Sequence, residues 1–335
     1  MSPLVLAARR ATRRHEAGLS LITHRGRGAS HFLLVPGLVP DGPETFLRQI
    51  PLLRRHGDVT VVSYPREHFD LDALLDVLRQ RTLAAASSGR RPVLVGVSVG
   101  GGFCLELLRR ARLAREEIPL RALVLISPLT CREDLAPLLQ RMLAPLLDVS
   151  NPDLRHEALE RGRAFFRALA QRSAPAATAE QRWPSWVRPL MDRGQERVRE
   201  RITRTLAEIS PDGGIERCRA VARLVGLGKG ALCSAPTLLL WASKERHTLD
   251  VNGPGVAHLN RPDLATRYFP RAEVQWVYSA DGSEVPHASL LLHHRAFNFA
   301  LARFLRRRSL YAAPAVARPL RVERPAFDDA AATPA

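Results

Sequence analysis

Short, uninterrupted runs of apolar residues alternate along the chain with segments whose apolar residues recur at helical spacing. Such runs predict strands buried on both faces, whereas recurrence every three or four residues predicts one face of a helix. Strands that alternate with helices favour an α/β fold with a doubly wound, mainly parallel sheet. The predicted strands cover residues 31–35, 59–62, 93–95, 122–126, 237–241 and 274–278, of which 31–35, 93–95 and 122–126 are expected to be buried, and residues 19–23 form a candidate edge strand. The predicted helices cover residues 44–56, 70–86, 103–110, 261–268 and 288–308.

The alternation is interrupted between residues 129 and 230, where the pattern predicts no strand. Helical spacing is present at 153–170 and 191–209, and a linker rich in Pro, Ala and Thr lies at 173–180. Ligands bind at the carboxyl ends of the strands in doubly wound sheets. We therefore expect residues 129–230 to form a helical cap that is inserted over those strand ends.

The insertion divides the rest of the chain. Residues 19–128 and 231–309 form the predicted core. Residues 1–18 are basic and are expected as a short helix or a disordered arm. Residues 310–335, rich in Ala and Pro, are expected to be a disordered tail because they offer little apolar surface to bury.

One stretch, residues 91–108, joins a predicted strand to a predicted helix through a turn rich in glycine. Gly96, Ser98 and Gly100 form the pattern G-x-S-x-G. At a sharp strand-to-helix turn this pattern exposes the serine hydroxyl, because glycine removes the side chains that would clash there. The alternative is the turn of a dinucleotide-binding unit, but that turn needs G-x-G-x-x-G, and residues 96–102 read G-V-S-V-G-G-G. The pattern therefore predicts Ser98 as a nucleophile.

A serine nucleophile needs a base that accepts its proton and an acid that orients the base. Together with G-x-S-x-G, several short segments resemble the α/β-hydrolase superfamily, and within it the lipase, esterase and serine-peptidase-like branch with a helical cap. The resemblance covers residues 19–128 and 231–309. The segments that carry it are Pro36-Gly37-Leu38, Gly96-Val97-Ser98-Val99-Gly100, Leu238-Leu239-Leu240-Trp241 with Glu245, and Val285-Pro286-His287-Ala288.

The resemblance implies a catalytic triad in the chain order nucleophile, acid, histidine. His287 follows the last predicted strand, where the family carries its base; the alternative is a surface histidine or a cap of the next helix. Glu245 lies four residues beyond Trp241, which is the family's spacing for the acid, although the family usually has aspartate there. Asp250, in the same loop, remains the alternative acid.

The resemblance also implies an oxyanion hole made of two backbone N–H groups. One belongs to Val99, the residue after the nucleophile, and by position the other belongs to Leu38. The family often has His-Gly before the second donor, whereas this chain has Pro36-Gly37. Since the donor is a backbone group, this departure removes a recognisable residue and leaves the donor in place.

The net charge of +17 invites comparison with nucleic-acid-binding proteins. The basic residues are almost all arginine, with lysine only at Lys229 and Lys244, and they form no basic stripe interleaved with aromatic residues and no nucleic-acid-binding motif. We therefore expect solvated arginines and no nucleic-acid partner. Weak attraction to an anionic membrane surface or to acidic substrates is the alternative.

Cysteine usage and the absence of targeting patterns bear on the compartment. The cysteines lack C-x-x-C spacing and suit a reducing, cytoplasmic setting. No apolar run has the length of a membrane span, and residues 1–18 lack the apolar region of a secretory signal. No metal-ligand spacing is present, so we expect neither a metal nor an organic cofactor. The four cysteines are Cys104, Cys131, Cys218 and Cys233.

These features predict a cytoplasmic serine hydrolase that cleaves a small-molecule carboxylic ester through an acyl-enzyme intermediate. Thioester or amide hydrolysis, acyl transfer and peptidase activity remain alternatives, because the pocket sets the substrate of this scaffold. A non-catalytic binding protein with a degenerate hydrolase fold is a further alternative. Four aromatic residues of the predicted cap are candidates for an acyl pocket or for packing between helices: Phe165, Phe166, Trp183 and Trp186.

Overall fold

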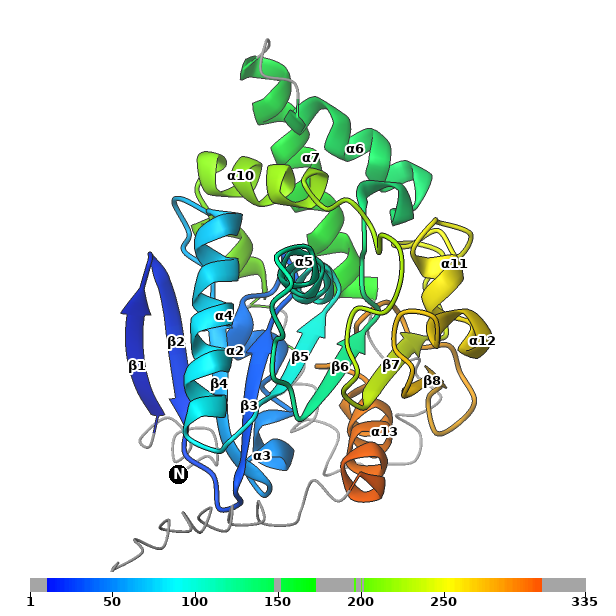
Figure 1. The fold of residues 1–335 in the computed structure, drawn as a ribbon. Helices are drawn as coiled ribbons and strands as arrows, with labels where there is room; N and C mark the ends of the chain where they lie inside the picture. Colours follow the sequence, from blue (N-terminus) through cyan, green and yellow to red (C-terminus); the bar gives the residue numbers. More distant parts are fainter. Residues whose placement is uncertain (1–10, 148–151, 173–195, 197–199, 201, 309–335) are drawn as a thin grey trace, which may run out of the picture.

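The computed structural model describes residues 11–147, 152–172, 196, 200 and 202–308. Eight strands form one sheet with the order β1-β2-β4-β3-β5-β6-β7-β8 (Figure 1). Strands β3 to β8 run parallel, and the first two strands join one edge in antiparallel pairing, so the predicted α/β fold with a mainly parallel sheet is confirmed. The strands are β1 (Ala11–Glu16), β2 (Leu19–His24), β3 (Ser30–Val35), β4 (Gly57–Ser63), β5 (Val93–Val97), β6 (Ala122–Ile126), β7 (Thr237–Ala242) and β8 (Ala272–Val277).

Helices cover both faces of this sheet (Figure 1). Adjacent residues of one strand enter different apolar clusters: Leu33 belongs to the cluster that contains α4 and α5, and Leu34 to the cluster that contains α3 and α13. This alternation follows from the two-residue period of a strand and explains why the central strands β5, β6 and β7 are almost entirely apolar. The helices are α2 (Gly42–Thr45), α3 (Ile50–Leu53), α4 (Leu71–Ser87), α5 (Val99–Leu113), α6 (Pro137–Leu147), α7 (Pro152–Arg172), α10 (Pro211–Ala222), α11 (Val256–Leu259), α12 (Pro262–Ala265) and α13 (His294–Arg307), with a 3₁₀ turn at Arg132–Asp134.

The expectation of a helix or disordered arm at the N-terminus was wrong for residues 11–16, which form the edge strand β1. This strand pairs with β2 along its whole length. A tight turn at Ala17 and Gly18, where both residues have positive φ, connects the two strands. Most of its side chains are exposed, so no apolar alternation marks it in the sequence. Residues 1–10 of the predicted arm and the predicted tail at 310–335 lie outside the described residues.

The single helix predicted over residues 44–56 is two short helices, α2 and α3. Pro51 accounts for the break, because it has no N–H to donate to the carbonyl four residues earlier and it favours the start of a helix. The helix predicted from residue 288 begins at His294 instead, since Ala288 has a left-handed backbone with φ of 46°. The helix predicted at 261–268 is likewise shorter, with α11 and α12 as separate turns.

Between β6 and β7 the described residues contain helices α6, α7 and α10 and no strand of the sheet. These helices pack on one another and lie together at the top of the view in Figure 1, beyond the ends of the strands. The predicted linker at 173–180 and most of residues 191–201 lie outside the described residues. The division into core and cap therefore remains a prediction, with the three helices at the position that it requires.

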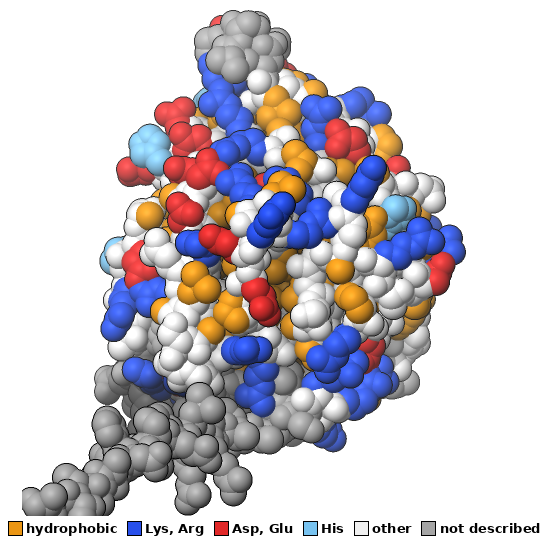
Figure 2. Space-filling view, viewed as in Figure 1, with side chains coloured by type: hydrophobic (Ala, Val, Ile, Leu, Met, Phe, Trp, Pro, Cys, Tyr) orange, Lys and Arg blue, Asp and Glu red, His pale blue; other side chains and the backbone are white. Residues whose placement is uncertain are grey.

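The basic side chains on the face drawn in Figure 2 are scattered among acidic and apolar ones. Many arginines of the molecule form ion pairs, such as Arg79, whose Nε lies 2.7 Å from a carboxylate oxygen of Glu116. In the described part of the chain, no helix is both long enough and apolar enough to cross a membrane.

Candidate active site

Ser98 lies at the tip of the turn between β5 and α5, with a backbone conformation of φ 53° and ψ −121°. Its N–H donates to the carbonyl of Ile126 at 2.8 Å, which fixes the turn against the neighbouring strand. A Cβ atom at Gly100 would lie 2.1 Å from the carbonyl oxygen of Pro36, and one at Gly96 would lie 2.6 Å from the backbone of α5. The two glycines of the G-x-S-x-G pattern are therefore required by close backbone approach.

The structure brings Ser98, His287 and Glu245 together. His287 Nε2 lies 2.9 Å from Ser98 Oγ, and His287 Nδ1 lies 2.5 Å from Glu245 Oε2. Because a carboxylate can only accept, Nδ1 donates to it, and Nε2 remains to accept from the serine hydroxyl. The Glu245 side chain is fully buried and that of His287 is 8% exposed. This arrangement can move a proton from serine to imidazole and hold the resulting positive charge beside a carboxylate.

His287 reaches this position because its segment is hydrogen-bonded to the loop that carries Glu245. The Lys244 N–H donates to the carbonyl of Val285 at 2.9 Å, and the Val285 N–H donates to Ser243 Oγ at 2.8 Å. Both bonds lie within two residues of the acid and of the histidine, so they fix the register between the two loops.

The carboxylate of Glu245 uses one oxygen for the scaffold and the other for the histidine. Oε1 accepts from the Ala242 N–H at 2.9 Å and from the Ser127 hydroxyl, while Oε2 faces His287. Ser127 is fully buried at the end of β6, and its N–H donates to the carbonyl of Leu240 at 2.7 Å. Sequence analysis missed Ser127, whose only signal is its position directly after a buried strand.

Asp250, the alternative acid, has other partners. Its Oδ1 accepts from the Asn252 N–H at 2.9 Å, and its own N–H donates to the carbonyl of Asp134 at 2.8 Å. The Asp250 carboxylate thus stabilises the turn at residues 250–253, and Glu245 is the acid that accepts the hydrogen bond from His287.

Backbone strain concentrates around the three residues. Five non-glycine residues of the described chain have positive φ, and three of them are Ser98 (53°), Ser127 (46°) and Ala288 (46°), the residue after His287. Such conformations cost of order 1–3 kcal/mol each and persist where the surroundings over-determine them. The clustering indicates that the backbone geometry of this region is kept at a cost in local stability.

The loop after β3 lies against Ser98, as the oxyanion-hole expectation requires. A Cβ atom at Gly37 would lie 3.4 Å from Ser98 Cβ and 3.9 Å from Ser98 Oγ. The next residue is Leu38, the expected second donor. Val99, the expected first donor, is the first residue of α5, where backbone N–H groups have no acceptor within the helix.

Two buried side chains hold the carbonyls on either side of the peptide that carries the Leu38 N–H. The Tyr64 hydroxyl donates to Pro36 O at 2.8 Å, and Arg217 Nη1 donates to Leu38 O at 3.0 Å. The Arg217 guanidinium also lies 5.5 Å from the centroid of the Tyr64 ring. Burial lowers the pKa of Arg217 and raises the pKa of Tyr64, so the phenol stays protonated and keeps its donor. Sequence analysis missed both residues.

Most of the aromatic residues that are candidates for an acyl pocket have side chains outside the described part of the structure. Trp183 and Trp186 lie outside the described residues, and the side chain of Phe166 is likewise not described. Phe165 is half-buried in α7. Among the described residues, no three His, Cys, Asp or Glu side chains are grouped so that they could hold a metal ion.

Comparisons with known proteins agree with this architecture. A model of the Alpha/beta hydrolase family matches residues 32–298. A search of curated proteins gives no match. Similar solved structures include an esterase from Thermogutta terrifontis, with 16% sequence identity, 90% of this chain and 99% of that chain covered, and a TM-score of 0.59. An esterase from Rhodococcus sp. has 14% identity, 89% and 98% coverage and a TM-score of 0.57. An epoxide hydrolase from Bacillus megaterium has 14% identity, 88% and 100% coverage and a TM-score of 0.52.

At these identities, the structural likeness speaks for the fold alone. The family match covers most of the chain, from β3 into α13, and includes Ser98, Glu245 and His287. The chain therefore belongs to the alpha/beta hydrolase family and is a hydrolase of that type.

Proposed function

We propose that the protein is a serine hydrolase that cleaves a carboxylic ester through an acyl-enzyme intermediate. The observation that carries this proposal is the continuous line of hydrogen bonds from Ser98 Oγ through His287 to Glu245. A serine hydroxyl is a weak nucleophile, and a hydrogen-bonded imidazole activates it by taking its proton as the new bond forms.

In the proposed first step, Ser98 Oγ attacks the ester carbonyl carbon while His287 Nε2 takes the hydroxyl proton. The tetrahedral intermediate collapses as the C–O bond to the alcohol breaks, and His287 gives the proton to the departing alcohol. A water molecule then attacks the acyl-enzyme, with His287 as its base, and releases the carboxylic acid and free Ser98. Glu245 keeps the imidazole in the tautomer that this sequence needs and stabilises its charged form.

The negative charge that develops on the carbonyl oxygen needs two donors. We assign them to the backbone N–H groups of Val99 and Leu38, since both segments lie next to Ser98. Removal of one such donor costs about 10²–10³ in turnover in well-studied cases. Tyr64 and Arg217 support the Leu38 donor as positioning residues, because they fix the peptide units on both sides of it.

The helices between β6 and β7 are proposed to act as a cap that selects the substrate. They lie beyond the strand ends, on the side of the molecule where Ser98 follows β5 (Figure 1). Arg217 of α10 links this block to the loop of the proposed oxyanion hole, so the two parts are not independent. An ester substrate is favoured over other acyl compounds because similar structures include esterases, and the triad itself would serve thioesters and amides equally.

A reducing compartment is also proposed. All four cysteines are free in the structure, and burial raises the pKa of each thiol, with Cys131 at about 11 and Cys218 at about 12. Such thiols are poor nucleophiles, which fits a cytoplasmic protein that neither needs nor forms disulfides.

The proposal is tested by turnover on p-nitrophenyl esters of graded acyl length, with matched thioester and anilide substrates. We expect measurable hydrolysis of at least one ester and a loss of at least about 10³ in Ser98→Ala, whose fold is checked by circular dichroism. An ester hydrolysis rate that is the same in folded Ser98→Ala would contradict it. No turnover of any substrate by the native protein would favour the non-catalytic alternative.

A further inference from the structure

A cavity of about 640 Å³ lies far from the candidate active site, at the amino-terminal ends of the parallel strands. Its wall is built from residues that immediately precede β5, β6, β7 and β8, together with the ends of α5 and α13. Ser98, in contrast, follows the carboxyl end of β5. Parallel strands all begin on one side of the sheet and end on the other, so the cavity lies at the amino-terminal ends of the strands and Ser98 at their carboxyl-terminal ends.

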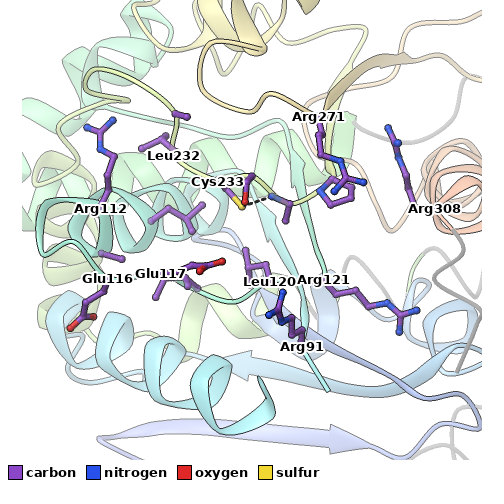
Figure 3. Close-up of a pocket in the computed structure, with 17 residues that line it drawn as sticks. Arg91, Arg112, Glu116, Glu117, Leu120, Arg121, Leu232, Cys233, Arg271 and Arg308 are labelled. Carbon is purple, nitrogen blue, oxygen red and sulfur yellow. Dashed lines mark hydrogen bonds between the residues drawn. The ribbon is translucent and has the colours of Figure 1, made fainter. Parts of the chain in front are cut away.

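Arginine dominates the charged lining. Figure 3 shows Arg112 towards one end of the cavity and Arg121, Arg271 and Arg308 towards the other, with Arg91 beneath them. Two carboxylates, Glu116 and Glu117, also line it, and Glu116 already accepts from Nε and Nη2 of Arg79, which lies outside the lining. The five arginines therefore outweigh the acidic groups that belong to the cavity.

Most of these arginines have no carboxylate partner. Within the described residues, Arg91, Arg112, Arg271 and Arg308 form no ion pair, although ion pairs are frequent elsewhere on the molecule. In the described part of the chain, Arg112 donates only to the backbone carbonyl of Gly230, at 3.1 Å. The Nε of Arg308 is buried and has no hydrogen-bond partner among the residues that the structure describes. Uncompensated guanidinium groups around one cavity make it a favourable place for an anion, since each offers a fork of donors that matches an oxyanion.

Most of the base of the cavity is apolar and aliphatic. Between the charged ends, Figure 3 shows Leu120, Leu232 and Cys233, with the carboxylate of Glu117 beside them. None of the described residues that line the cavity is aromatic, so a nucleotide base would find no ring to stack on. The volume is in the range of small-molecule sites. The buried aliphatic lining consists of Leu108, Ala111, Ile118, Leu120, Leu232 and Ala235.

We infer that this cavity is a second ligand site that binds an anion with an aliphatic chain, an alkyl phosphate or an alkyl carboxylate. The oxyanion lies among the arginines at the rim, and the chain covers the aliphatic base. Neither part alone accounts for the lining. A free inorganic anion leaves the apolar base wet, and a neutral chain leaves Arg91, Arg271 and Arg308 without an anionic partner among the described residues. The site is independent of the proposed hydrolysis, since it shares no residue with Ser98, His287 or Glu245.

The test is titration calorimetry on the full chain with four probes: n-octyl phosphate below its micelle concentration, n-octanoate, inorganic phosphate and n-octanol. We expect one of the two alkyl anions to bind at least about tenfold more tightly than inorganic phosphate and n-octanol, because only the alkyl anions satisfy both parts of the cavity. The tighter of the two identifies the headgroup. Equal binding of octanol, or no binding of either alkyl anion, would overturn the inference.

Variants locate the binding. The Arg91→Gln/Arg271→Gln double variant removes two exposed guanidinium groups and is expected to weaken binding at least about tenfold without loss of fold. Arg306→Gln is the matched control, because Arg306 is exposed in the same helix turn as Arg308 but does not line the cavity. Unchanged binding in the double variant, or an equal loss in the control, would contradict the assignment. None of these outcomes depends on whether Ser98 is a nucleophile.

Discussion

Two buried carboxylates, Asp134 and Glu245, lie in loops that follow neighbouring strands, yet they have different surroundings. Both are almost completely buried, with 0% and 2% exposure. Both oxygens of Asp134 are saturated: Oδ1 accepts from the N–H groups of Gly255 and Val256, and Oδ2 accepts from the N–H and the hydroxyl of Thr130. Glu245 has donors from the scaffold on one oxygen only, and its other oxygen faces an imidazole.

Burial of a carboxylate therefore does not by itself indicate function. The donors around Asp134 come from two chain segments that are more than a hundred residues apart, so this carboxylate joins them and has no capacity left. In Glu245, one carboxylate oxygen accepts hydrogen bonds from the scaffold, and the other accepts the hydrogen bond from His287. A buried acid that orients a group able to accept a proton is the one that can take part in chemistry.

Among these variants, Glu245→Gln is expected to have the largest effect on turnover. Glutamine keeps the size of the side chain but removes the charge that stabilises the imidazolium, so we expect turnover on an activated ester to fall by at least about 100-fold. The melting temperature should change little in comparison. Asp250→Asn is the control from the same loop, and its turnover should fall by less than about tenfold, because the Asp250 carboxylate accepts a hydrogen bond from the Asn252 N–H within a turn. A crippled Asp250→Asn with an active Glu245→Gln would reverse the assignment of the acid.

Asp134→Asn should show the opposite behaviour. The amide NH₂ must face either the two backbone donors or Thr130, which leaves buried donors without an acceptor and costs about 3 kcal/mol of unfolding free energy. Turnover per folded molecule should stay near that of the native protein. Urea unfolding and activity below the transition check both statements. If turnover falls as far as in Glu245→Gln while stability is unchanged, the distinction between the two carboxylates is lost.

Arg217→Met tests whether the active region extends into the block between β6 and β7. Loss of the bond to Leu38 O should loosen the proposed oxyanion donor, so we expect kcat to fall about tenfold with little change in KM. Arg217→Lys, which keeps a donor, should recover part of the rate. Arg219→Met on the same helix is the control and should behave like the native protein. A loss confined to stability, with kcat intact in all variants, would show that Arg217 is only structural.

Asp58 extends the comparison to a buried carboxylate that is paired with arginine. Burial alone would raise its pKa, but the Gly26 N–H and the arginines Arg25 and Arg90 outweigh that effect and hold the pKa below its ordinary value of 3.8. A carboxyl group with a depressed pKa in the folded state stabilises the fold above its unfolded pKa and loses that contribution as the pH falls.

We therefore expect the native protein to lose about 1 kcal/mol more stability than Asp58→Asn between pH 5 and pH 3, a small effect because Arg25 is mostly exposed. Urea unfolding at both pH values measures it. Equal losses in the two proteins would show that Asp58 carries no pH dependence.

The apolar runs predicted the strands β3 to β7 because most positions of these strands are buried. Residues 274–278 also predicted β8, although that strand lies at the edge of the sheet and most of its side chains are half-buried or exposed. The edge strand β1 could not be predicted in this way, since its Arg13 and Arg14 face solvent and its order comes from pairing with β2. Glycine spacing predicted the turn at Ser98, because close backbone approach leaves a local signature there.

The supporting residues of the site leave no such signature. Ser127, Tyr64 and Arg217 act through bonds to residues between 28 and 179 positions away. An arginine in an amphipathic helix is expected to face solvent, so only the fold shows that Arg217 is buried. For the same reason, spacing alone could not decide between Glu245 and Asp250, whereas the pairing of the two loops brings Glu245 to the histidine.

The most direct test of the central claim is covalent labelling with a fluorophosphonate, followed by peptide mass spectrometry. The proposed triad predicts one adduct, on Ser98, that is absent in Ser98→Ala. It also predicts a labelling rate that is lower by at least about 100-fold in Glu245→Gln and nearly unchanged in Asp250→Asn and Asp134→Asn, because in the proposed mechanism Glu245 is the acid that orients His287. An adduct on a different residue, or equal labelling of native and Ser98→Ala protein, would contradict it.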